Sequence, residues 1–147
     1  MRIQIAATDA EIASCFSTML ILRPHLVEGE FVARVKSMHG EGFVLAFLED
    51  EGEVRAVAGY RMHDLLFSGR TLYVDDLVTL AGDRSKGYGS KLLRWLEQEA
   101  KKHRCTTFTL DSGVFRYDAH RFYFRERMAI FGYHFSKPVP GDDTLAR

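Results

Sequence analysis

The segment from Leu77 to Leu93 places an apolar, β-branched run, a glycine-containing loop and an amphipathic stretch one directly after another. This succession predicts a strand that turns into the first turn of a helix. The first turn of a helix leaves backbone N–H groups without partners and carries partial positive charge, so anions bind there. The segment therefore predicts an α/β chain with a phosphate site at this loop.

The loop itself reads Arg-Ser-Lys-Gly-Tyr-Gly over residues 84–89. Gly87 and Gly89 lack Cβ atoms, which lets the backbone approach phosphates closely, and Arg84 and Lys86 add positive charge. The P-loop class is excluded because no Gly-Lys-Ser/Thr closes the loop. The Rossmann class is excluded because the pattern is Gly-x-Gly only, behind an arginine.

Composition narrows the class of protein further. The chain has 147 residues, of which 46% are hydrophobic, so we expect one domain spanning residues 1–147. A formal net charge of zero gives no reason to expect nucleic acid or a membrane as partner. Cys15, Cys105 and the six histidines show no metal-ligand spacing, so we expect no metal. The absence of a leader or membrane-length apolar run predicts a cytoplasmic protein.

The hydrophobic periodicity predicts the order β-α-α-β-β-β-α-β-α-β, which a mixed α/β or α+β sheet satisfies. The expected strands are Arg2–Ala6, Phe43–Glu49, Val54–Met62, Thr71–Leu80, Thr106–Asp111 and Tyr133–Lys137. The expected helices are one with an apolar face from Ile12 to Leu20, a shorter one from Val27 to Met38, then Gly87–His103 and Tyr117–Met128.

Arg84, Gly87 and Gly89 occupy the three positions of Gln/Arg-x-x-Gly-x-Gly/Ala, so the loop resembles the acyl-coenzyme A loop of the GNAT superfamily (Gcn5-related N-acetyltransferases). The likeness runs from Phe43 to Lys137. It implies acetyl-CoA as co-substrate, and two neighbouring strands, Thr71–Leu80 and Thr106–Asp111, splayed apart to admit its pantetheine arm. The residues expected to bind the coenzyme are Leu77, Val78, Thr79, Arg84, Ser85, Lys86, Gly87, Tyr88, Gly89, Ser90, Arg116 and Tyr123.

By the same resemblance, the backbone N–H of Leu77 would face the thioester carbonyl, and that of Thr79 would bond the pantetheine chain. Sequence cannot test this, because a backbone donor needs no particular side chain.

Residues 73–79 resemble the corresponding strand of spermidine/spermine-type acetyltransferases, which implies Asp75 as the favoured base or water relay and Asp76 as the second choice. Alternation along a strand predicts Tyr73, Asp75 and Leu77 on one face and residues 74, 76 and 78 on the other. In the alternative interpretation, the two aspartates cap the sheet edge or pair with Arg70 or His63. Many family members carry a glutamate at the position of Tyr73, which leaves the base open.

Residues 116–123 resemble the family's Ala-x-x-Phe-Tyr helix motif. The likeness implies Tyr123 as the acid that protonates the departing coenzyme sulfur, and a phenol matches a thiol closely enough in pKa for that transfer. The alternative is an aromatic core residue. Arg116 replaces the family's frequent asparagine; it would contact a coenzyme phosphate or an anionic acceptor, or lie solvated at a helix start.

The resemblance implies acetyl transfer to a primary amine of a small molecule, by direct attack in a ternary complex because no nucleophile for an acyl-enzyme is evident. Alternatives are a coenzyme-binding regulatory module, a protein N-terminal or lysine acetyltransferase, and an unrelated α/β interaction protein. The acidic pair favours a cationic acceptor, whereas Arg116 and a likeness to aminoalkylphosphonate acetyltransferases favour an anionic one. Many family members form homodimers, to which the segment after Ser136 would contribute. The expected acceptor pocket comprises Arg23, His25, Val27, Phe31, Tyr73 and Asp75.

Overall fold

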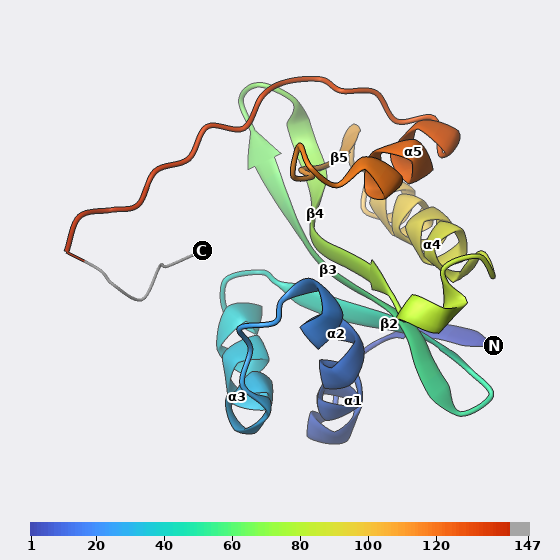
Figure 1. Ribbon diagram of the computed structural model, residues 1–147. Helices are drawn as coiled ribbons and strands as arrows, with labels where there is room; N and C mark the ends of the chain where they lie inside the picture. Colours follow the sequence, from blue (N-terminus) through green and yellow to red (C-terminus); the bar gives the residue numbers. More distant parts are fainter. Residues whose placement is uncertain (142–147) are drawn as a thin grey trace. The chain divides into compact units, whose positions relative to one another are not determined.

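The computed structural model describes residues 1–141, and these divide into two compact units, Met1–Leu110 and the described residues from Asp111 onward. The first unit contains five strands, four α-helices and one short 3-10 helix, and the second contains one helix (Figure 1). In chain order the elements are β1 Arg2–Ile5, α1 Asp9–Ser14, α2 Phe16–Leu22, α3 Glu28–His39, β2 Val44–Asp50, β3 Glu53–Leu65, β4 Gly69–Thr79, η1 Ala81–Asp83, α4 Tyr88–Lys102, β5 Thr107–Leu110 and α5 Tyr117–Arg125.

One mixed sheet organises the first unit. Its strands lie in the order β1-β2-β3-β4-β5, with antiparallel neighbours from β1 to β4 and a parallel pair between β4 and β5. The turn between β2 and β3 places Glu51 and Gly52 at positive φ, as a two-residue hairpin turn requires. The parallel pair needs a crossover, and α4 supplies it. The mixed α/β sheet predicted from the sequence is therefore confirmed.

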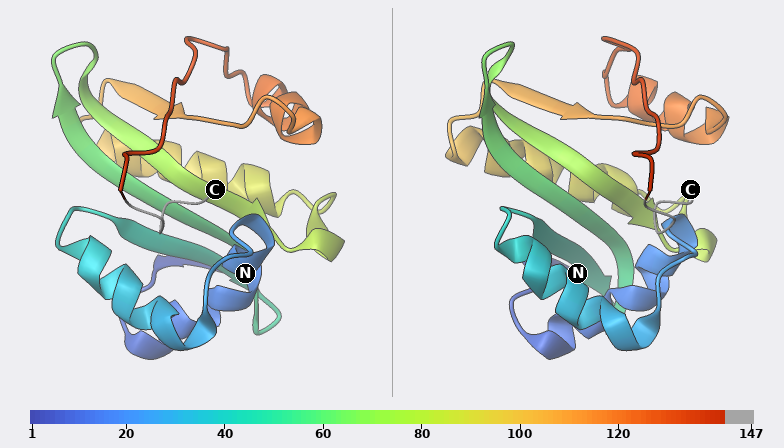
Figure 2. Two further views of the ribbon diagram at one scale, coloured as in Figure 1. Left: turned by 60° about the vertical axis from the view of Figure 1, so that its left-hand side comes forward. Right: turned by 90° about the vertical axis from the view of Figure 1, so that its left-hand side faces the viewer.

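Helices cover both faces of this sheet, with α1, α2 and α3 on one side and α4 on the other (Figures 1 and 2). Each face has its own apolar core, as a sheet between two helical layers requires. The core beneath α1–α3 comprises Ala6, Ile12, Cys15, Phe16, Met19, Phe31, Val35, Phe43, Leu45, Phe47, Val54, Val57 and Val78. The core beneath α4 comprises Ala46, Leu48, Ala56, Ala58, Tyr60, Leu72, Val74, Tyr88, Leu92, Leu96 and Ala100.

The first predicted helix is divided in two. Thr8 caps α1: its side chain accepts from the Glu11 N–H, and the Glu11 carboxylate accepts from the Thr8 N–H at 3.0 Å, which completes a capping box. The helix ends at Ser14, and α2 begins at Phe16, so the apolar periodicity continues across a break at Cys15. Periodicity reports which face is buried and does not by itself detect such a break.

The predicted final strand Tyr133–Lys137 is wrong for the structure described, because these residues lie in no strand. They belong to the second unit, where α5 ends at Arg125 and the described chain beyond Met128 is irregular. Tyr133 and Phe135 are 85% and 92% exposed. Alternating apolar residues specify a strand only when a sheet edge pairs with them, and one strand alone is not stable.

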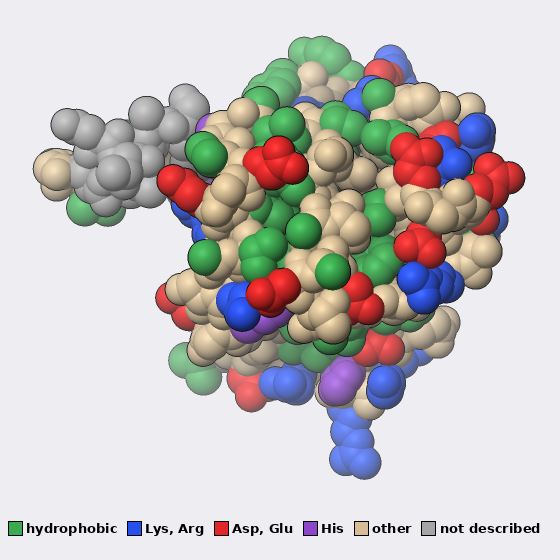
Figure 3. Space-filling view, turned by 90° about the horizontal axis from the view of Figure 1, so that it is seen from below, with side chains coloured by type: hydrophobic (Ala, Val, Ile, Leu, Met, Phe, Trp, Pro, Cys, Tyr) green, Lys and Arg blue, Asp and Glu red, His purple; other side chains and the backbone are tan. Residues whose placement is uncertain are grey.

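No helix within residues 1–141 is long and apolar enough to span a membrane. Figure 3 views the molecule from below, the side towards which α1 and α3 lie in Figure 1, and shows acidic and basic side chains intermixed rather than separated by sign.

Candidate active site

A β-bulge in β4 determines where its two acidic side chains lie. Gly59 of β3 faces Asp76, whereas the next residue, Tyr60, faces Val74, so Asp75 is the extra residue of the bulged strand. A Cβ added to Gly59 would lie 2.6 Å from the Asp76 carboxylate, so only glycine leaves room for that side chain.

Both carboxylates are paired with arginines. Arg61 of β3 donates from Nε to the two Asp75 oxygens at 3.1 and 3.2 Å and from Nη2 to Oδ2 at 2.6 Å. Arg23, at the end of α2, donates from Nε to Asp76 at 2.8 Å and from Nη2 to the Asp75 carbonyl at 3.0 Å. Burial raises the pKa of Asp76, and its bond with Arg23 acts in the opposite direction. The partners considered from the sequence, Arg70 and His63, are therefore wrong.

The bulge also overturns the predicted alternation of faces. The Arg61 guanidinium lies 5.7 Å from the ring centre of Phe43, which belongs to the core beneath α1–α3, so Asp75 points to that side. Leu77 packs against the core beneath α4, on the opposite side. Asp75 and Leu77 were predicted to share a face; they do not, because an extra residue shifts the two-residue period by one.

Strand β5 pairs with β4 over its whole length, whereas β4 pairs with β5 over only part of its own. Their described pairs join Thr71–Val74 to Thr107–Leu110, and β4 continues beyond them to Thr79. The GNAT resemblance implies that the two strands splay apart; the structure shows β4 extending five residues past the end of β5, and the splaying itself stays a prediction. The Leu80 N–H donates to Arg55 of β3 at 2.8 Å, and neighbouring amides in a strand point in opposite directions, so the amides of Thr79 and Leu77 point away from β3. They point toward the edge of β4 that lies beyond the last pair with β5.

The glycine loop follows directly on this edge. Gly87 adopts φ +80° and precedes α4, whose first intrahelical bond runs from the Lys91 N–H to the Gly87 carbonyl at 3.1 Å. The side chains of Arg84, Ser85 and Lys86 are exposed, and Arg84 forms no ion pair within residues 1–141. A positive-φ glycine, exposed cations and a helix start fit the pyrophosphate of a coenzyme.

Two loop residues differ from the simplest expectation. Lys86 Nζ lies 2.9 Å from Asp83, so its charge is already shared with a carboxylate. The Tyr88 side chain is buried, and its hydroxyl donates to Asp50 at 2.8 Å. The Tyr88 phenol is therefore already hydrogen-bonded, and only the backbone N–H of this residue is available to a ligand of the loop. Gly89 and Ser90 lie in the first turn of α4, where backbone N–H groups have no partner within the helix.

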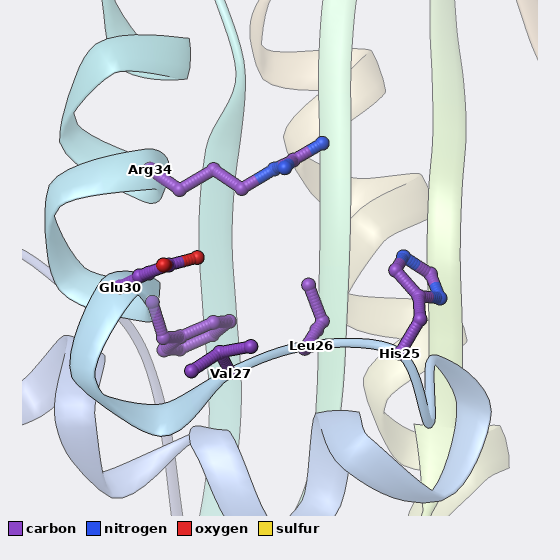
Figure 4. Close-up of a pocket in the computed structure, with 6 residues that line it drawn as sticks. His25, Leu26, Val27, Glu30 and Arg34 are labelled. Carbon is purple, nitrogen blue, oxygen red and sulfur yellow. The ribbon is translucent and has the colours of Figure 1, made fainter. Parts of the chain in front are cut away.

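A small pocket opens beside the loop that joins α2 to α3 (Figure 4). Three predicted acceptor residues, His25, Val27 and Phe31, line it, whereas Arg23 forms the ion pair described above. Phe31 is also a core residue, with its ring 5.3 Å from that of Phe16. Tyr73 lies half-buried on β4 and does not line this pocket. The remaining lining residues are Leu26, Glu30 and Arg34.

In the second unit, Tyr123 lies on α5 and Arg116 is the residue that precedes the helix. Burial raises the pKa of Tyr123, while the neighbouring Arg116 acts in the opposite direction through its charge and a side-chain hydrogen bond. A phenol with a raised pKa holds its proton at neutral pH, as a general acid must.

Sequence reasoning missed several residues of the site. Arg61 could be found only from the β3–β4 register, which the bulge shifts. Glu30 and Arg34 lie one helical turn apart on α3, so helical spacing from Phe31 was a usable signal. Asp83 carried a local signal in its three-residue spacing from Lys86, but its pairing with Arg55 on β3 had none. Within residues 1–141 no cluster of His, Cys, Asp and Glu is suited to hold a metal ion.

Comparison with known proteins agrees with this geometry. The family model for the acetyltransferase (GNAT) family matches residues 10–128. The uncharacterized N-acetyltransferase YhdJ of Bacillus subtilis (strain 168) is 36% identical over 132 residues, which are 88% of this chain and 92% of that protein.

Two further similarities are shorter or more distant. The aminoalkylphosphonate N-acetyltransferase of Salmonella typhimurium (strain LT2) is 38% identical over 66 residues, 45% of this chain and 43% of that protein. The crystal structure of a GNAT family acetyltransferase from Staphylococcus aureus shares the fold, with a TM-score of 0.79 at 18% identity, covering 94% of this chain and 98% of that one. With the family model spanning most of its length, the chain belongs to the acetyltransferase (GNAT) family and is an acyltransferase.

Proposed function

We propose that this protein transfers an acetyl group from acetyl-CoA to a primary amine of a small molecule, by direct attack in a ternary complex. The observation that carries the proposal is the edge of β4 beyond its last pair with β5, which leads directly into the glycine loop. The GNAT family generally uses acetyl-CoA as co-substrate, which supplies an activated acetyl thioester when bound.

The backbone of β4 and the loop holds the donor. The Leu77 N–H stabilises the negative charge that develops on the carbonyl oxygen, and the Thr79 N–H bonds the pantetheine chain with Val78 between them. The loop amides over residues 84–90 bind the pyrophosphate, and Arg84 adds a charge-assisted contact. These donors are fixed by the fold and need no reorganisation as charge develops.

An alkylammonium must lose its proton before it attacks, and Asp75 is our first candidate to accept it, directly or through water. Arginines hold both carboxylates, and the Asp75 side chain is the more exposed of the two, at 19% against 14% for Asp76. Asp76 is therefore the second candidate. In Asp75→Asn, loss of the base would change the alkaline limb of the rate profile; Asp76→Asn is the matched comparison.

We propose that Tyr123 protonates the departing coenzyme sulfur. Arg116 would lie beside it and hydrogen-bond to its hydroxyl. The support is the sequence motif, together with a phenol that keeps its proton at neutral pH. Direct attack is preferred because neither cysteine is a ready nucleophile. Burial raises the pKa of Cys15 to about 12 and raises that of Cys105 as well.

The acceptor would enter beside the α2–α3 loop, near Arg23, His25 and Val27. The partial similarity to an aminoalkylphosphonate N-acetyltransferase supports a small-molecule amine. The pocket there offers both signs of charge, a carboxylate from Glu30 and a guanidinium from Arg34 (Figure 4). An acceptor that carries an ammonium and an anionic group would match both.

The proposal treats residues 1–147 as one acetyltransferase domain, because the family model runs through both compact units. It places the reaction in the cytoplasm, where free cysteines such as Cys15 and Cys105 stay reduced. A homodimer formed through the segment after Ser136 is part of the proposal, and light scattering of the purified protein tests it.

Two experiments test this function. Isothermal titration with acetyl-CoA should give saturable heat, and a protein without binding would contradict the coenzyme site. A panel of aminoalkylphosphonates, polyamines and lysine peptides, followed by thiol release, should then show turnover of a small amine. Binding without any turnover would identify a regulatory module instead, and turnover of peptides alone would identify a protein acetyltransferase.

A further inference from the structure

Hydrogen bonds link both ends of the glycine loop to the hairpin of β2 and β3, close to its turn. At its start, Asp83 Oδ2 accepts from Arg55 Nη1 at 3.1 Å, and the Leu80 N–H donates to the Arg55 carbonyl at 2.8 Å. At its end, the buried Tyr88 hydroxyl donates to Asp50 Oδ2 at 2.8 Å. Arg55 Nε also donates to the Asp50 carbonyl at 3.2 Å, which joins the two anchors.

Asp83 occupies the centre of this arrangement. Its side chain is only 4% exposed, and its second oxygen lies 2.9 Å from Lys86 Nζ across the turn. Its carbonyl accepts from the Lys86 N–H at 3.0 Å. The Lys86 ammonium, followed by Arg55, lowers the pKa of Asp83 below its usual value. Burying a carboxylate costs free energy that its two ion pairs offset, and removal of either partner would leave the charge uncompensated.

We propose that Asp83 is a positioning residue that holds the loop in its phosphate-binding conformation through Arg55 and Lys86. The inference rests on the proposed function, since it assumes that this loop binds the coenzyme pyrophosphate. The exposed turn over residues 84–87 lies between the two anchors, so its amides and Arg84 keep one geometry before ligand arrives. Preorganisation of this kind reduces the ordering cost of binding.

Arg55 and Lys86 also change the charge that the loop presents to a ligand. A carboxylate one residue before Arg84 would repel a pyrophosphate if its charge stood alone. Lys86 neutralises it, and Arg55, which also pairs with Glu53 at 3.1 Å and Glu51 at 3.6 Å, holds its other oxygen. The loop therefore presents the positive charge of Arg84 and the helix start instead. Lys86 thereby contributes through Asp83, rather than as a free lysine reaching for phosphate.

The test measures acetyl-CoA affinity by titration calorimetry in Asp83→Asn, in Arg55→Met and in Arg55→Lys, which retains the cation. We expect the dissociation constant to rise about tenfold or more in the first two, because a misplaced loop loses its aligned contacts, and to recover partly in Arg55→Lys. Lys102→Met, at the far end of the same helix, is the control and should bind as wild type does.

A second comparison separates positioning from general damage to the fold. S-acetylpantetheine lacks the pyrophosphate, so Asp83→Asn should lower kcat/KM for acetyl-CoA and leave that for the truncated donor unchanged. Tyr88→Phe, which weakens the other anchor without removing a buried charge, should show the same selectivity if Asp83→Asn does not fold. Equal loss with both donors, or wild-type affinity in the folded variants, overturns the proposal. Wild-type protein that binds no acetyl-CoA contradicts the proposed function itself.

Discussion

Gly59→Ala tests the geometry of the bulge directly. A Cβ at this position would lie 2.5 Å from Cε2 and Cζ of Phe43 and 2.6 Å from Oδ2 of Asp76. Neither neighbour can move freely: the Phe43 side chain is buried, and Asp76 is held by Arg23 at 2.8 Å. Relief therefore requires the strand or the ion pair to shift.

Overpacking of this kind costs about 1–3 kcal/mol in a well-packed core. For a chain of this size each kcal/mol lowers the melting temperature by about 2–4 °C, so we expect Tm to fall by about 2–12 °C. Thermal melting followed by circular dichroism, with urea titration for the free energy of unfolding, measures the loss.

Gly29→Ala is the matched control, because the same methyl group on α3 meets nothing within 4 Å. Alanine is favoured over glycine in a helix by up to about 1 kcal/mol, so this variant should melt at or above the wild-type temperature. Should Gly59→Ala also melt there, the close approach of Phe43 and Asp76 to this glycine would be refuted.

Three further predictions concern the coenzyme loop, the acid and the ion pair. Gly87→Val should weaken acetyl-CoA binding strongly, since a β-branched residue resists φ +80° and would crowd the phosphates; calorimetric affinity equal to wild type contradicts the loop geometry. Tyr123→Phe should lower kcat by about 10²-fold or more in a thiol-release assay while acetyl-CoA affinity changes little, and unchanged turnover rejects the acid role. Arg23→Met should cost about 1–3 kcal/mol at pH 7, where it leaves the Asp76 carboxylate buried without its partner. The pKa of Asp76 is already raised in the folded protein, so protonation relieves this cost, and the loss should shrink as the pH falls toward 4 in urea titrations. A loss independent of pH would show that Asp76 is not the group responsible, and Lys36→Met, an exposed pair with Asp9, is the control.

The parts of the fold that local chemistry specifies were predictable. The glycine loop and α4 carry their signals within one short segment, and the predicted helix Gly87–His103 differs from α4 by one residue at each end. The capping residue Thr8 and the hairpin turn at Gly52 are likewise local. Each of these elements could be predicted because backbone preference and side-chain pattern agree over a few neighbouring residues.

The arrangement of the acidic side chains depends on contacts that are distant in sequence. Asp75 meets Arg61, and Asp76 meets Arg23, 53 residues away. The bulge that turns both carboxylates to one side exists only in the register between β3 and β4. A two-residue period cannot reveal an inserted residue, so the predicted faces were wrong after Asp75, for residues 76 to 78.

Because Asp75 and Asp76 are both paired with arginines, they no longer indicate a cationic acceptor. Two adjacent aspartates alone would attract a polycationic amine, but Arg23 and Arg61 lie within hydrogen-bonding distance and bring the local charge of the four groups to zero. Opposite charges this close cancel at the distance from which a substrate approaches, so they exert little steering. Selection by charge then depends on groups outside the pairs, and the pocket beside the α2–α3 loop offers Glu30 and Arg34 there. In the proposed site, two neutral ion pairs beside one carboxylate and one guanidinium would favour a zwitterionic amine over a polyamine.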